Sequence, residues 1–524
     1  MIPEGRSAQA TGRRALDRIA RALEPLYGFA TTSRGFWILL AGYLAIHAAL
    51  RLWASPNIGT DDVEQALFAQ YWAWGYNPPQ PPLFTWLLLV AYTLFGTGVL
   101  AHVAVKYATL GVTYALAYAC ARRLIASQTL AVLATLSLVL IYDFGWGVHT
   151  GVTHSLTLSA AVFGTLLATV RLVERRRTLD YLLLGLAIGL GLLTKYSYGV
   201  FVAPLLGACL LVRPIRGAVL DRRMILGLGL AALIFLPHGI WMLTVGPNYR
   251  TTLAALGVVG ARPSWLANVG TGLGSLAQAT ILFLAPFWLV ALLLFGPMIR
   301  RPAEPARPWL RALAWTLAIA LGALALTVLV AEVTYFKDRR MHAVLLTVPL
   351  LLFIWLDHRQ PEARRLRWLA GSIGTVVVTA WLALVGQALF EPYTCRRCWL
   401  HMPLPAFAET IRQAGFTRGT IVTADEHLGG NLRLAFPRSR VLTPPYPTLD
   451  PAPRGGEGCV LAWHARMIGD ALPPQLGAFV AGRFKLAPEG TPVVVELPMM
   501  RRPGRLDRFA YLIATNADGD CHPR

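Results

Sequence analysis

Three acidic residues begin the part of the sequence that is richest in groups able to do chemistry. Asp61, Asp62 and Glu64 follow the first long apolar run and precede a cluster of aromatic residues. A carboxylate can act as a general base, taking a proton from a hydroxyl or amine as that group attacks carbon. The aromatic neighbours indicate that the attacked carbon is the anomeric carbon of a sugar. Aromatic rings stack on the apolar faces of sugars, and carboxylates accept hydrogen bonds from sugar hydroxyls. Asp61 and Asp62 are therefore the catalytic candidates.

The same stretch also has a structural interpretation. The spacing Asp61-x-x-Glu64 is typical of a capping box, in which side chains satisfy the free N–H groups at the start of a helix. Capping and base catalysis are compatible, since one Asp can do both or the two can divide the work.

A helix is predicted over residues 61–74, with an apolar stripe made by Val63, Ala66, Leu67, Tyr71 and Trp74. Such a stripe suits a helix that lies in the plane of a membrane interface. The Pro-rich segment 77–82 cannot continue this helix. Aromatic residues at an interface are often only membrane anchors, so sugar binding is one of two interpretations. The candidates for sugar or acceptor binding are Glu64, Trp72, Trp74, Tyr76, Gln80, His149, His154 and Tyr196.

Cationic residues form a second set of candidates. Lys106 lies inside an apolar run and Lys195 lies between two apolar halves, and ionisable groups at such depth are often functional. A basic turn at 337–340 follows a later run, where a salt bridge with Asp338 or Glu332 is the structural alternative. Clustered cations suit a phosphate or pyrophosphate. The candidates for binding such a phosphate are Lys195, Lys337, Arg339, Arg340 and Lys106.

Two histidines, His149 and His154, flank the gap between two apolar runs. They suit a metal pair, but histidines in such places are more often hydrogen-bonded at helix interfaces. We predict no metal site and no cofactor; a divalent metal is not indicated.

The composition places these residues in a membrane protein. Of the 524 residues, 55% are hydrophobic and only 14% are charged, whereas soluble domains carry about 25% charged residues. The net charge of +21 comes from Lys and Arg in short clusters between apolar runs. This is the positive-inside pattern of membrane topology, so we expect no nucleic-acid partner. We also expect no cleavable signal peptide, because a long Arg-containing segment precedes the first apolar run.

The apolar runs predict an α-helical polytopic domain over residues 35–390, preceded by a basic cytoplasmic tail, 1–34, with a possible amphipathic helix at Leu16, Ile19 and Leu23. The first extracytoplasmic loop is 54–98. Within it, 83–95 is short for a span, so it is predicted to be interfacial or re-entrant. This choice places every Arg cluster but 337–340 on one side. Eleven spans are then expected, at 36–53, 99–121, 127–143, 153–170, 180–196, 198–212, 224–244, 272–298, 312–332, 341–356 and 369–389.

Residues 391–524 lack a run of membrane length and predict an extracytoplasmic α/β domain. Helices are expected at 404–414 and 428–435, and strands at 419–424, 459–464 and 493–497. An oxidising compartment permits disulfides, and the three possible full pairings stay open for Cys395, Cys398, Cys459 and Cys521. A redox or zinc role for Cys395-x-x-Cys398 is the alternative. We expect a bacterial inner membrane location, with the N-terminus cytoplasmic and residues 391–524 periplasmic.

Several motifs together resemble the GT-C glycosyltransferases, in particular the bacterial relatives of dolichyl-phosphate-mannose protein mannosyltransferases, a branch that includes the lipid A aminoarabinose transferase. The matching segments are Asp61-Asp62, Ala73-Trp74-Gly75-Tyr76, Pro81-Pro82-Leu83, 189–196 (GLGLLTKY), 336–341 (FKDRRM) and the C-terminal GGNLRLAFP. The resemblance implies that Asp61 is the catalytic base and that Lys195 or the 337–340 turn holds the donor phosphate. The sequence departs from the family pattern at three positions. Asp62 stands where the family usually has Glu, and Gln80 stands where it has His or Lys. His154 stands where the family often has Asp.

The resemblance implies an inverting glycosyltransferase. It would move a sugar from a polyprenyl-phosphate donor to an envelope acceptor: lipid A or lipopolysaccharide, protein or another glycan. A transporter or flippase of lipid-linked sugars is the rival, favoured by the many spans and intramembrane lysines. A catalytically inactive glycan-binding relative is a third alternative. The absence of an internal hydropathy repeat disfavours the transporter. The expected partners are the lipid donor, the lipid or glycan acceptor and the bilayer.

Overall fold

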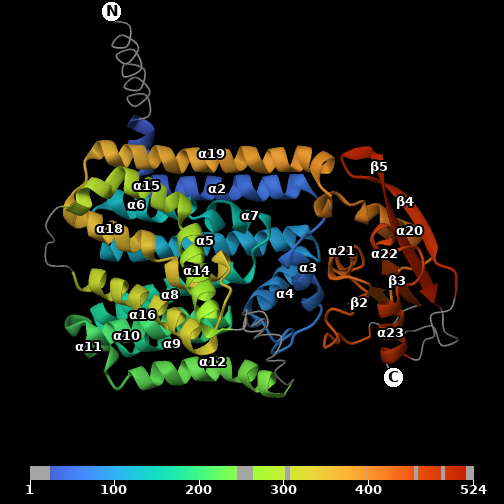
Figure 1. Cartoon of the computed structure of the whole chain (residues 1–524), viewed down its shortest axis with the longest axis horizontal. Helices are drawn as coiled ribbons and strands as arrows, with labels where there is room; N and C mark the ends of the chain where they lie inside the picture. The colour runs from blue at the N-terminus through green and yellow to red at the C-terminus, as the bar shows by residue number, and fades with distance from the viewer. Residues whose placement is uncertain are drawn as a thin grey trace, which may run out of the picture.

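Long apolar helices run side by side along most of the molecule, and a small domain with a sheet adjoins one end of them (Figure 1). The computed structural model describes residues 24–244, 264–300, 307–396, 398–453, 458–484 and 490–514. In these ranges, seven helices are long and apolar enough to cross a membrane, or up to ten if each bent pair of helices counts as one span. The predicted polytopic helical architecture is confirmed, while the count of eleven spans stays a prediction.

The described residues of the membrane domain form a series of long and medium-length helices. They are α2 (Ser33–Ala54), α4 (Leu83–Phe95), α5 (Val99–Leu124), α6 (Gln128–Leu136), α8 (His154–Arg175), α9 (Thr178–Leu192), α10 (Gly199–Leu211), α12 (Met224–Thr244), α14 (Trp265–Phe283), α15 (Ala285–Phe295), α16 (Pro308–Ala331), α18 (Val348–Arg359) and α19 (Ala363–Thr394). Short segments between them are η1 (Ser137–Leu140), the π-helical η2 (Asp143–Gly147), α7 (Val148–Thr150), η3 (Tyr196–Tyr198), α11 (Arg213–Val219), η4 (Gly296–Arg300), η5 (Asp338–Met341) and α17 (His342–Leu345).

Small residues let these helices pack closely. Gly185 of α9 lies against the backbone of Gly227 of α12, so a side chain at either position would collide with the other helix. Close backbone approach at glycine is a common source of helix association in membranes, where van der Waals packing replaces the hydrophobic effect.

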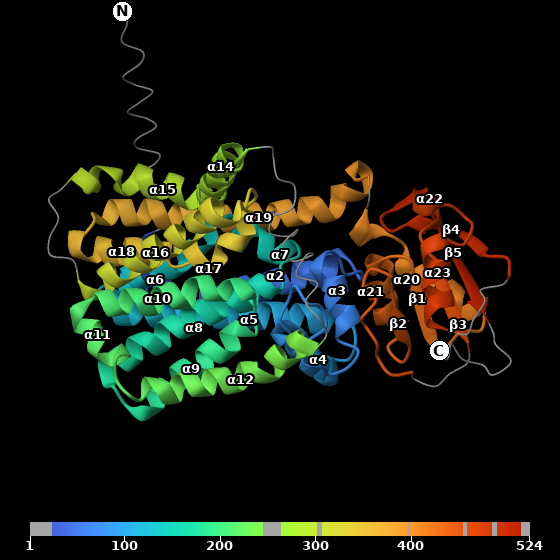
Figure 2. The ribbon, with the colours of Figure 1, turned by 60° about the horizontal axis from the view of Figure 1, so that its bottom comes forward.

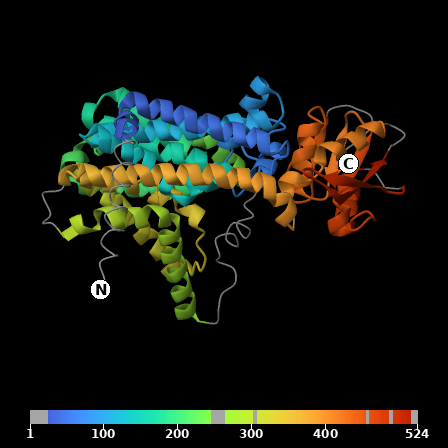
Figure 3. The same cartoon turned by 90° about the horizontal axis from the view of Figure 1, so that it is seen from above.

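The predicted span at 272–298 is wrong as a single helix. The structure has α14 and α15 instead, with a break at Leu284 and with Pro286 at the start of α15. Proline lacks the N–H that an uninterrupted helix requires, so the apolar run divides there. Figure 3 shows α14 projecting from the side of the bundle. Leu83–Phe95 forms one short helix of 13 residues, as the sequence indicates.

The two ends of the bundle differ in charge. At the end far from the sheet, Arg123 forms an ion pair with Glu174, and Arg223 donates a hydrogen bond to the Arg176 carbonyl at 2.6 Å. The Arg clusters predicted to face the cytoplasm therefore lie together, and we call this the basic end. The opposite end holds α3 (Asp61–Phe68) and α4 beside the C-terminal domain, and we call it the domain end (Figures 1 and 2).

The C-terminal domain contains a five-stranded sheet of order β2-β1-β3-β5-β4. The strands are β1 (Thr420–Thr423), β2 (Arg440–Leu442), β3 (Cys459–Trp463), β4 (Val493–Met499) and β5 (Arg502–Ala514), and the helical segments are η6 (Trp399–His401), α20 (Leu404–Gln413), α21 (Glu426–Ala435), α22 (Ala465–Ile468) and α23 (Pro474–Arg483). The first three strands are parallel, and β5 is antiparallel to both neighbours. The predicted α/β domain is confirmed, including its helices near 404–414 and 428–435 and its three predicted strands.

A disulfide joins Cys395 to Cys398 at the junction between α19 and this domain. It agrees with the structural interpretation of the Cys-x-x-Cys pair. Cys459 is also disulfide-bonded, and Cys521 lies outside the described residues.

The helix predicted over 61–74 ends at Phe68. In α3, the face that carries Val63 and Leu67 is covered by α21 of the C-terminal domain. A Cβ added at Gly430 of α21 would lie 2.7 Å from the Cα of Val63. This part of the predicted apolar stripe therefore contacts protein, whereas Trp74 is exposed and the placement of the helix at a membrane interface stays a prediction. The amphipathic helix predicted in the N-terminal tail falls outside the described residues.

Candidate active site

The backbone bends sharply just before Asp61. Thr60 has φ 47° and ψ −126°, a conformation that is costly for a residue with a branched side chain. Its hydroxyl donates to the Gly151 carbonyl at 3.4 Å, and a side chain at Gly151 would collide with Thr60. The bend makes Thr60 the N-cap of α3, without a side-chain capping bond, and Asp61 the first helical residue. The capping-box interpretation of Asp61 and Glu64 is therefore wrong.

Asp62 is buried in a network of ionisable groups. Its Oδ2 accepts a hydrogen bond from Lys106 Nζ at 3.1 Å, and its Oδ1 lies 3.6 Å from His102 Nδ1. Burial raises the pKa of a carboxyl, but here Lys106 and His102 outweigh it and hold the pKa of Asp62 well below its usual range. Asp62 is therefore an ionised, fixed carboxylate.

Asp61 has different surroundings although it is the adjacent residue. Within the described ranges its carboxylate has no hydrogen-bond partner and no ion pair. Burial raises the pKa of Asp61, while the charges of Arg339 and Lys195 act in the opposite direction. A carboxylate with a raised pKa and no fixed partner is suited to accept a proton.

Lys195 and Arg339 come from distant parts of the chain and meet beside Asp61. Lys195 follows α9, and its Nζ donates to Ser155 Oγ at 2.9 Å. Burial, with Arg339 as the next cause, lowers the pKa of Lys195 to about 8. Arg339 lies in η5 with an exposed side chain. Two cations next to one unpaired carboxylate form an anion-binding arrangement at the domain end of the bundle.

The acidic neighbours of the basic turn contact other groups. Glu332 accepts a hydrogen bond from Asn268 at 2.6 Å, and the Asp338 carboxylate accepts one from the backbone of Arg339. In the part of the chain that the structure describes, neither Lys337 nor Arg339 forms an ion pair with a carboxylate. These two cations of the turn are therefore not held by Glu332 or Asp338, and Arg339 lies close enough to Asp61 to act on its pKa.

Glu64 lies at the contact between the two domains. Its carboxylate accepts a hydrogen bond from Asn77 Nδ2 at 3.1 Å. Burial raises the pKa of Glu64 to about 7, although Asn77 and the hydroxyl of Tyr446 act in the opposite direction. Glu64 thereby ties the Pro-rich elbow and the C-terminal domain to α3.

The aromatic candidates divide into exposed and buried groups. Trp72 and Trp74 are 60% and 56% exposed. Tyr76 is buried, with its hydroxyl donating to the Tyr71 carbonyl at 2.8 Å, so its role is to shape the loop. Gln80 is half-buried in the elbow, where its backbone N–H donates to the Asn77 carbonyl.

The two histidine candidates make structural hydrogen bonds. His149 lies between the hydroxyls of Tyr43 and Tyr107. His154 contacts Gln65 Nε2 at 3.0 Å, which makes that ring nitrogen the acceptor. These separate networks favour the hydrogen-bonded interpretation of the two histidines over a metal pair. Among the described residues, no group of three or more His, Cys, Asp or Glu side chains has an arrangement suited to a metal ion.

Tyr196 supports the elbow of the first loop. Its hydroxyl donates to the Pro78 carbonyl at 3.1 Å and lies 3.0 Å from His238 Nε2. The other nitrogen of His238 donates to the Trp74 carbonyl at 2.7 Å. Sequence reasoning missed His238, although a histidine inside an apolar run is the same signal that selected Lys106.

Asn431 of α21 was also missed. Its Oδ1 accepts from the Ile58 N–H at 2.9 Å and its Nδ2 donates to the Ile58 carbonyl at 3.0 Å. The Asn431 side chain thus satisfies both backbone groups of Ile58, as a neighbouring strand would, and fixes the backbone that leads to Asp61. The GGN motif was visible in the sequence, but its contact across more than three hundred residues was not.

Comparisons with known proteins show which proteins this chain is similar to. Residues 79–241 match the family model described as dolichyl-phosphate-mannose-protein mannosyltransferase. The chain is similar to two lipopolysaccharide core galacturonosyltransferases of Rhizobium johnstonii, RgtB and RgtA. The identity is 29% for RgtB, over 91% of this chain and 97% of the relative, and 27% for RgtA, over 84% and 89%.

The fold is also that of a solved structure. The crystal structure of ArnT from Cupriavidus metallidurans bound to undecaprenyl phosphate superposes with a TM-score of 0.58, at 15% identity, covering 91% of this chain and 98% of that one. The chain is thus similar in sequence to polytopic glycosyltransferases and shares the fold of the ArnT structure. In this chain, the first-loop acidic residues lie where the helical bundle meets the C-terminal domain.

Proposed function

We propose that this chain is a glycosyltransferase that moves a sugar from a polyprenyl-phosphate donor to lipopolysaccharide, with inversion at the anomeric carbon and with Asp61 as the base. The observation that carries the proposal is the unpaired Asp61 carboxylate beside Lys195 and Arg339. One group can take a proton while the others bind the phosphate that leaves.

The reaction balances with these groups. The acceptor oxygen forms a bond to the anomeric carbon as the bond from that carbon to the phosphate oxygen breaks. The bonding electrons pass to the phosphate, and the hydroxyl proton passes to Asp61. Lys195 and Arg339 stabilise the charge that grows on the leaving phosphate. Lys337 and Arg340 extend the same basic surface, with Trp72 and Trp74 exposed on the first loop.

Asp62 and Lys106 receive supporting roles. Their mutual ion pair occupies both charges, so Lys106 positions Asp62 and the start of α3, while Lys195 and Arg339 are the principal phosphate ligands. This division follows from the contacts that each cation already makes.

The substrates are proposed from the relatives. RgtA and RgtB are lipopolysaccharide core galacturonosyltransferases, and the ArnT structure contains undecaprenyl phosphate. We therefore propose galacturonic acid on a polyprenyl phosphate as the first donor to test and the lipopolysaccharide core as acceptor. The location would be the outer face of the inner membrane, where neither substrate requires a nucleotide.

The test uses the full chain in lipid with a panel of polyprenyl-phosphate sugars and purified lipopolysaccharide. Asp61→Asn should lower the transfer rate by about 100-fold or more, which is the usual contribution of a general base. Donor binding should stay within about threefold of wild type. The matched control is Asp470→Asn, the same change at an exposed surface pair with Arg508.

Transfer by Asp61→Asn at the wild-type rate would refute the role of Asp61. Absence of transfer by the wild-type protein with every donor, together with movement of lipid-linked sugar across the bilayer, would instead support the transporter. Donor and acceptor binding without either activity would support the glycan-binding relative.

A further inference from the structure

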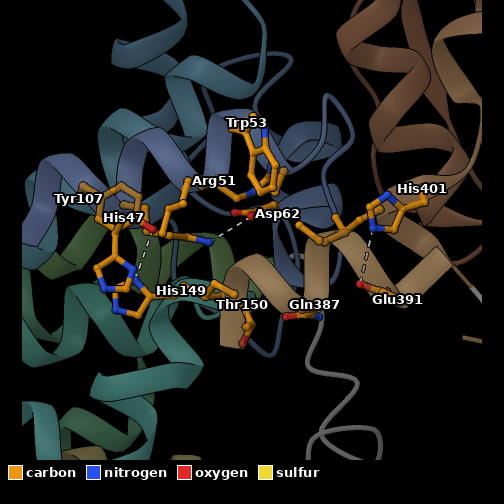
Figure 4. A pocket seen from close by; sticks show the side chains of 17 residues that line it. His47, Arg51, Trp53, Asp62, Tyr107, His149, Thr150, Gln387, Glu391 and His401 are labelled. Carbon is orange, nitrogen blue, oxygen red and sulfur yellow. Dashed lines mark hydrogen bonds and ion pairs between the residues drawn. The ribbon is translucent and has the colours of Figure 1, made fainter. Parts of the chain in front are cut away.

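A cavity at the domain end is lined in part by Asp62, whereas neither Lys195 nor Arg339 lines it. It lies among the ends of α2 and α19, the beginning of α5, the short helix α7 and the segment η6 (Figure 4). The side chains that give it its chemistry include His47, Arg51, Asp62, Gln387, Glu391 and His401.

Polar groups in this cavity lack protein partners. Both ring nitrogens of His47 and both of His401 have no hydrogen-bond partner in the described chain, although each side chain is only 1% exposed. Oε2 of Glu391 is also unpartnered and lies 3.9 Å from His401 Nε2, which is too long for a hydrogen bond. Buried polar groups are normally satisfied, so this cluster is suited to a ligand that supplies the missing bonds.

The cations of the wall already contact protein groups. Arg51 donates to the carbonyls of Ser55 at 2.9 Å and Asn57 at 2.6 Å, and Lys106 is paired with Asp62. The atoms without hydrogen-bond partners in the described chain include those of the two histidines and Glu391 instead. The pKa of His401 is lowered, chiefly by burial, so its ring is neutral and presents one donor and one acceptor. Neutral donors and acceptors match hydroxyl groups, each of which can donate and accept.

The wall is shared between the domains, and hydrogen bonds hold the backbone that carries His401. His401 belongs to the C-terminal segment, and its carbonyl accepts from the Met500 N–H at 3.0 Å. Asn57 Nδ2 donates to the carbonyls of the flanking Leu400 and Met402 at 3.3 and 2.8 Å. The His401 ring is thus placed before a ligand arrives, which reduces the entropy cost of binding.

The cavity also reaches the catalytic bend. Gly59 and Asp62 both line it, and they flank the Thr60–Asp61 step. A ligand in this cavity would therefore lie close to the segment that carries Asp61.

We propose that this cavity binds a neutral sugar residue of the acceptor glycan, whose hydroxyls hydrogen-bond to His47, His401 and Glu391. The inference rests on the proposed function and adds the acceptor subsite to it. It also gives the C-terminal domain a role, since that domain supplies part of the wall.

The test measures acceptor and donor binding separately. The acceptor probe is core oligosaccharide released from lipopolysaccharide by mild acid, titrated into the full chain in lipid. The donor-side probe is polyprenyl phosphate. His47→Ala and His401→Ala should each weaken oligosaccharide binding about tenfold or more and leave polyprenyl phosphate binding unchanged. His401→Asn, which keeps a donor and an acceptor, should restore part of the affinity. His358→Ala in α18 at the basic end is the matched control.

A second variant keeps the buried histidines. Thr150 is exposed at the cavity, so Thr150→Phe should block access without disturbing the core, and should weaken oligosaccharide binding to the same degree. Unchanged oligosaccharide binding in all variants would overturn the inference and indicate a cavity filled by water. Weakened binding of polyprenyl phosphate alone would also overturn it. Because both probes report binding without turnover, failure of the proposed reaction is distinguishable from failure of this subsite.

Discussion

Asp61 and Asp62 have the same side chain, but their neighbours give them different properties. Asp62 is paired with Lys106 and stays ionised, whereas Asp61 is half-buried, unpaired and next to Lys195. A pair of titratable groups whose surroundings move their pKa values apart is a common basis for assigning acid and base roles. At the residue scale, the assignment therefore depends on contacts and not on residue type.

Lys195 makes the pH dependence testable. Its pKa is lowered to about 8, so the ammonium loses its proton as the pH rises through that value. If the charge stabilises the leaving phosphate, kcat/KM for transfer should fall above about pH 8. Lys195→Arg stays charged at high pH, so its alkaline fall should move upward even if its maximal rate is lower.

The measurement is a profile of kcat/KM against pH for both proteins, with donor binding followed in parallel. An alkaline limb at the same pH in Lys195→Arg would show that another group causes it.

The element that decides the site is α3, because it connects the two domains. The apolar face of α3 packs on α21 through Gly429 and Gly430, while Asn431 holds the backbone of Ile58. The helix is short, so its stability comes from these contacts and not from its intrinsic propensity. The position of the first turn of α3, which carries Asp61 and Asp62, therefore depends on the contact with α21.

A methyl group at Gly430 tests this contact. In Gly430→Ala the new Cβ would lie 2.7 Å from Val63 backbone atoms, which cannot move aside without moving α3. We expect a loss of about 1–3 kcal/mol in stability, as for other overpacked interfaces, and a lower transfer rate.

The matched control is Gly371→Ala in α19, where nothing lies within 4 Å of the added Cβ. That change should be neutral or slightly stabilising in a helix. Thermal unfolding of the purified proteins in detergent and transfer assays on both variants give the comparison. Equal stability of the two would indicate that α3 and α21 can separate freely.

At the scale of the whole molecule, charge and shape give the two ends of the bundle different roles. The Arg clusters lie at the basic end, and the acidic first loop, η5 and the C-terminal domain lie at the domain end (Figure 1). The positive-inside rule then predicts that the domain end faces the periplasm.

Cysteine labelling tests this orientation. A membrane-impermeant thiol reagent added to intact cells with a permeable outer membrane should label Asp470→Cys on the C-terminal domain. It should label Glu174→Cys at the basic end only after the inner membrane is opened. Both sites are partly exposed surface positions, so access to the thiol is comparable. The opposite pattern would reverse the predicted topology.

The sequence alone determined the polytopic helical architecture, most helix positions and the α/β nature of residues 391–524, and it selected Asp61 as a catalytic candidate. These features depend on local signals such as hydropathy, proline placement and short motifs, each of which is formed by residues close together in the sequence. The tertiary structure decided the end of α3 at Phe68, the different surroundings of Asp61 and Asp62, and the cavity that both His47 and His401 line. Those features depend on contacts between segments that are distant in the chain, and burial and pairing exist only once the chain is folded.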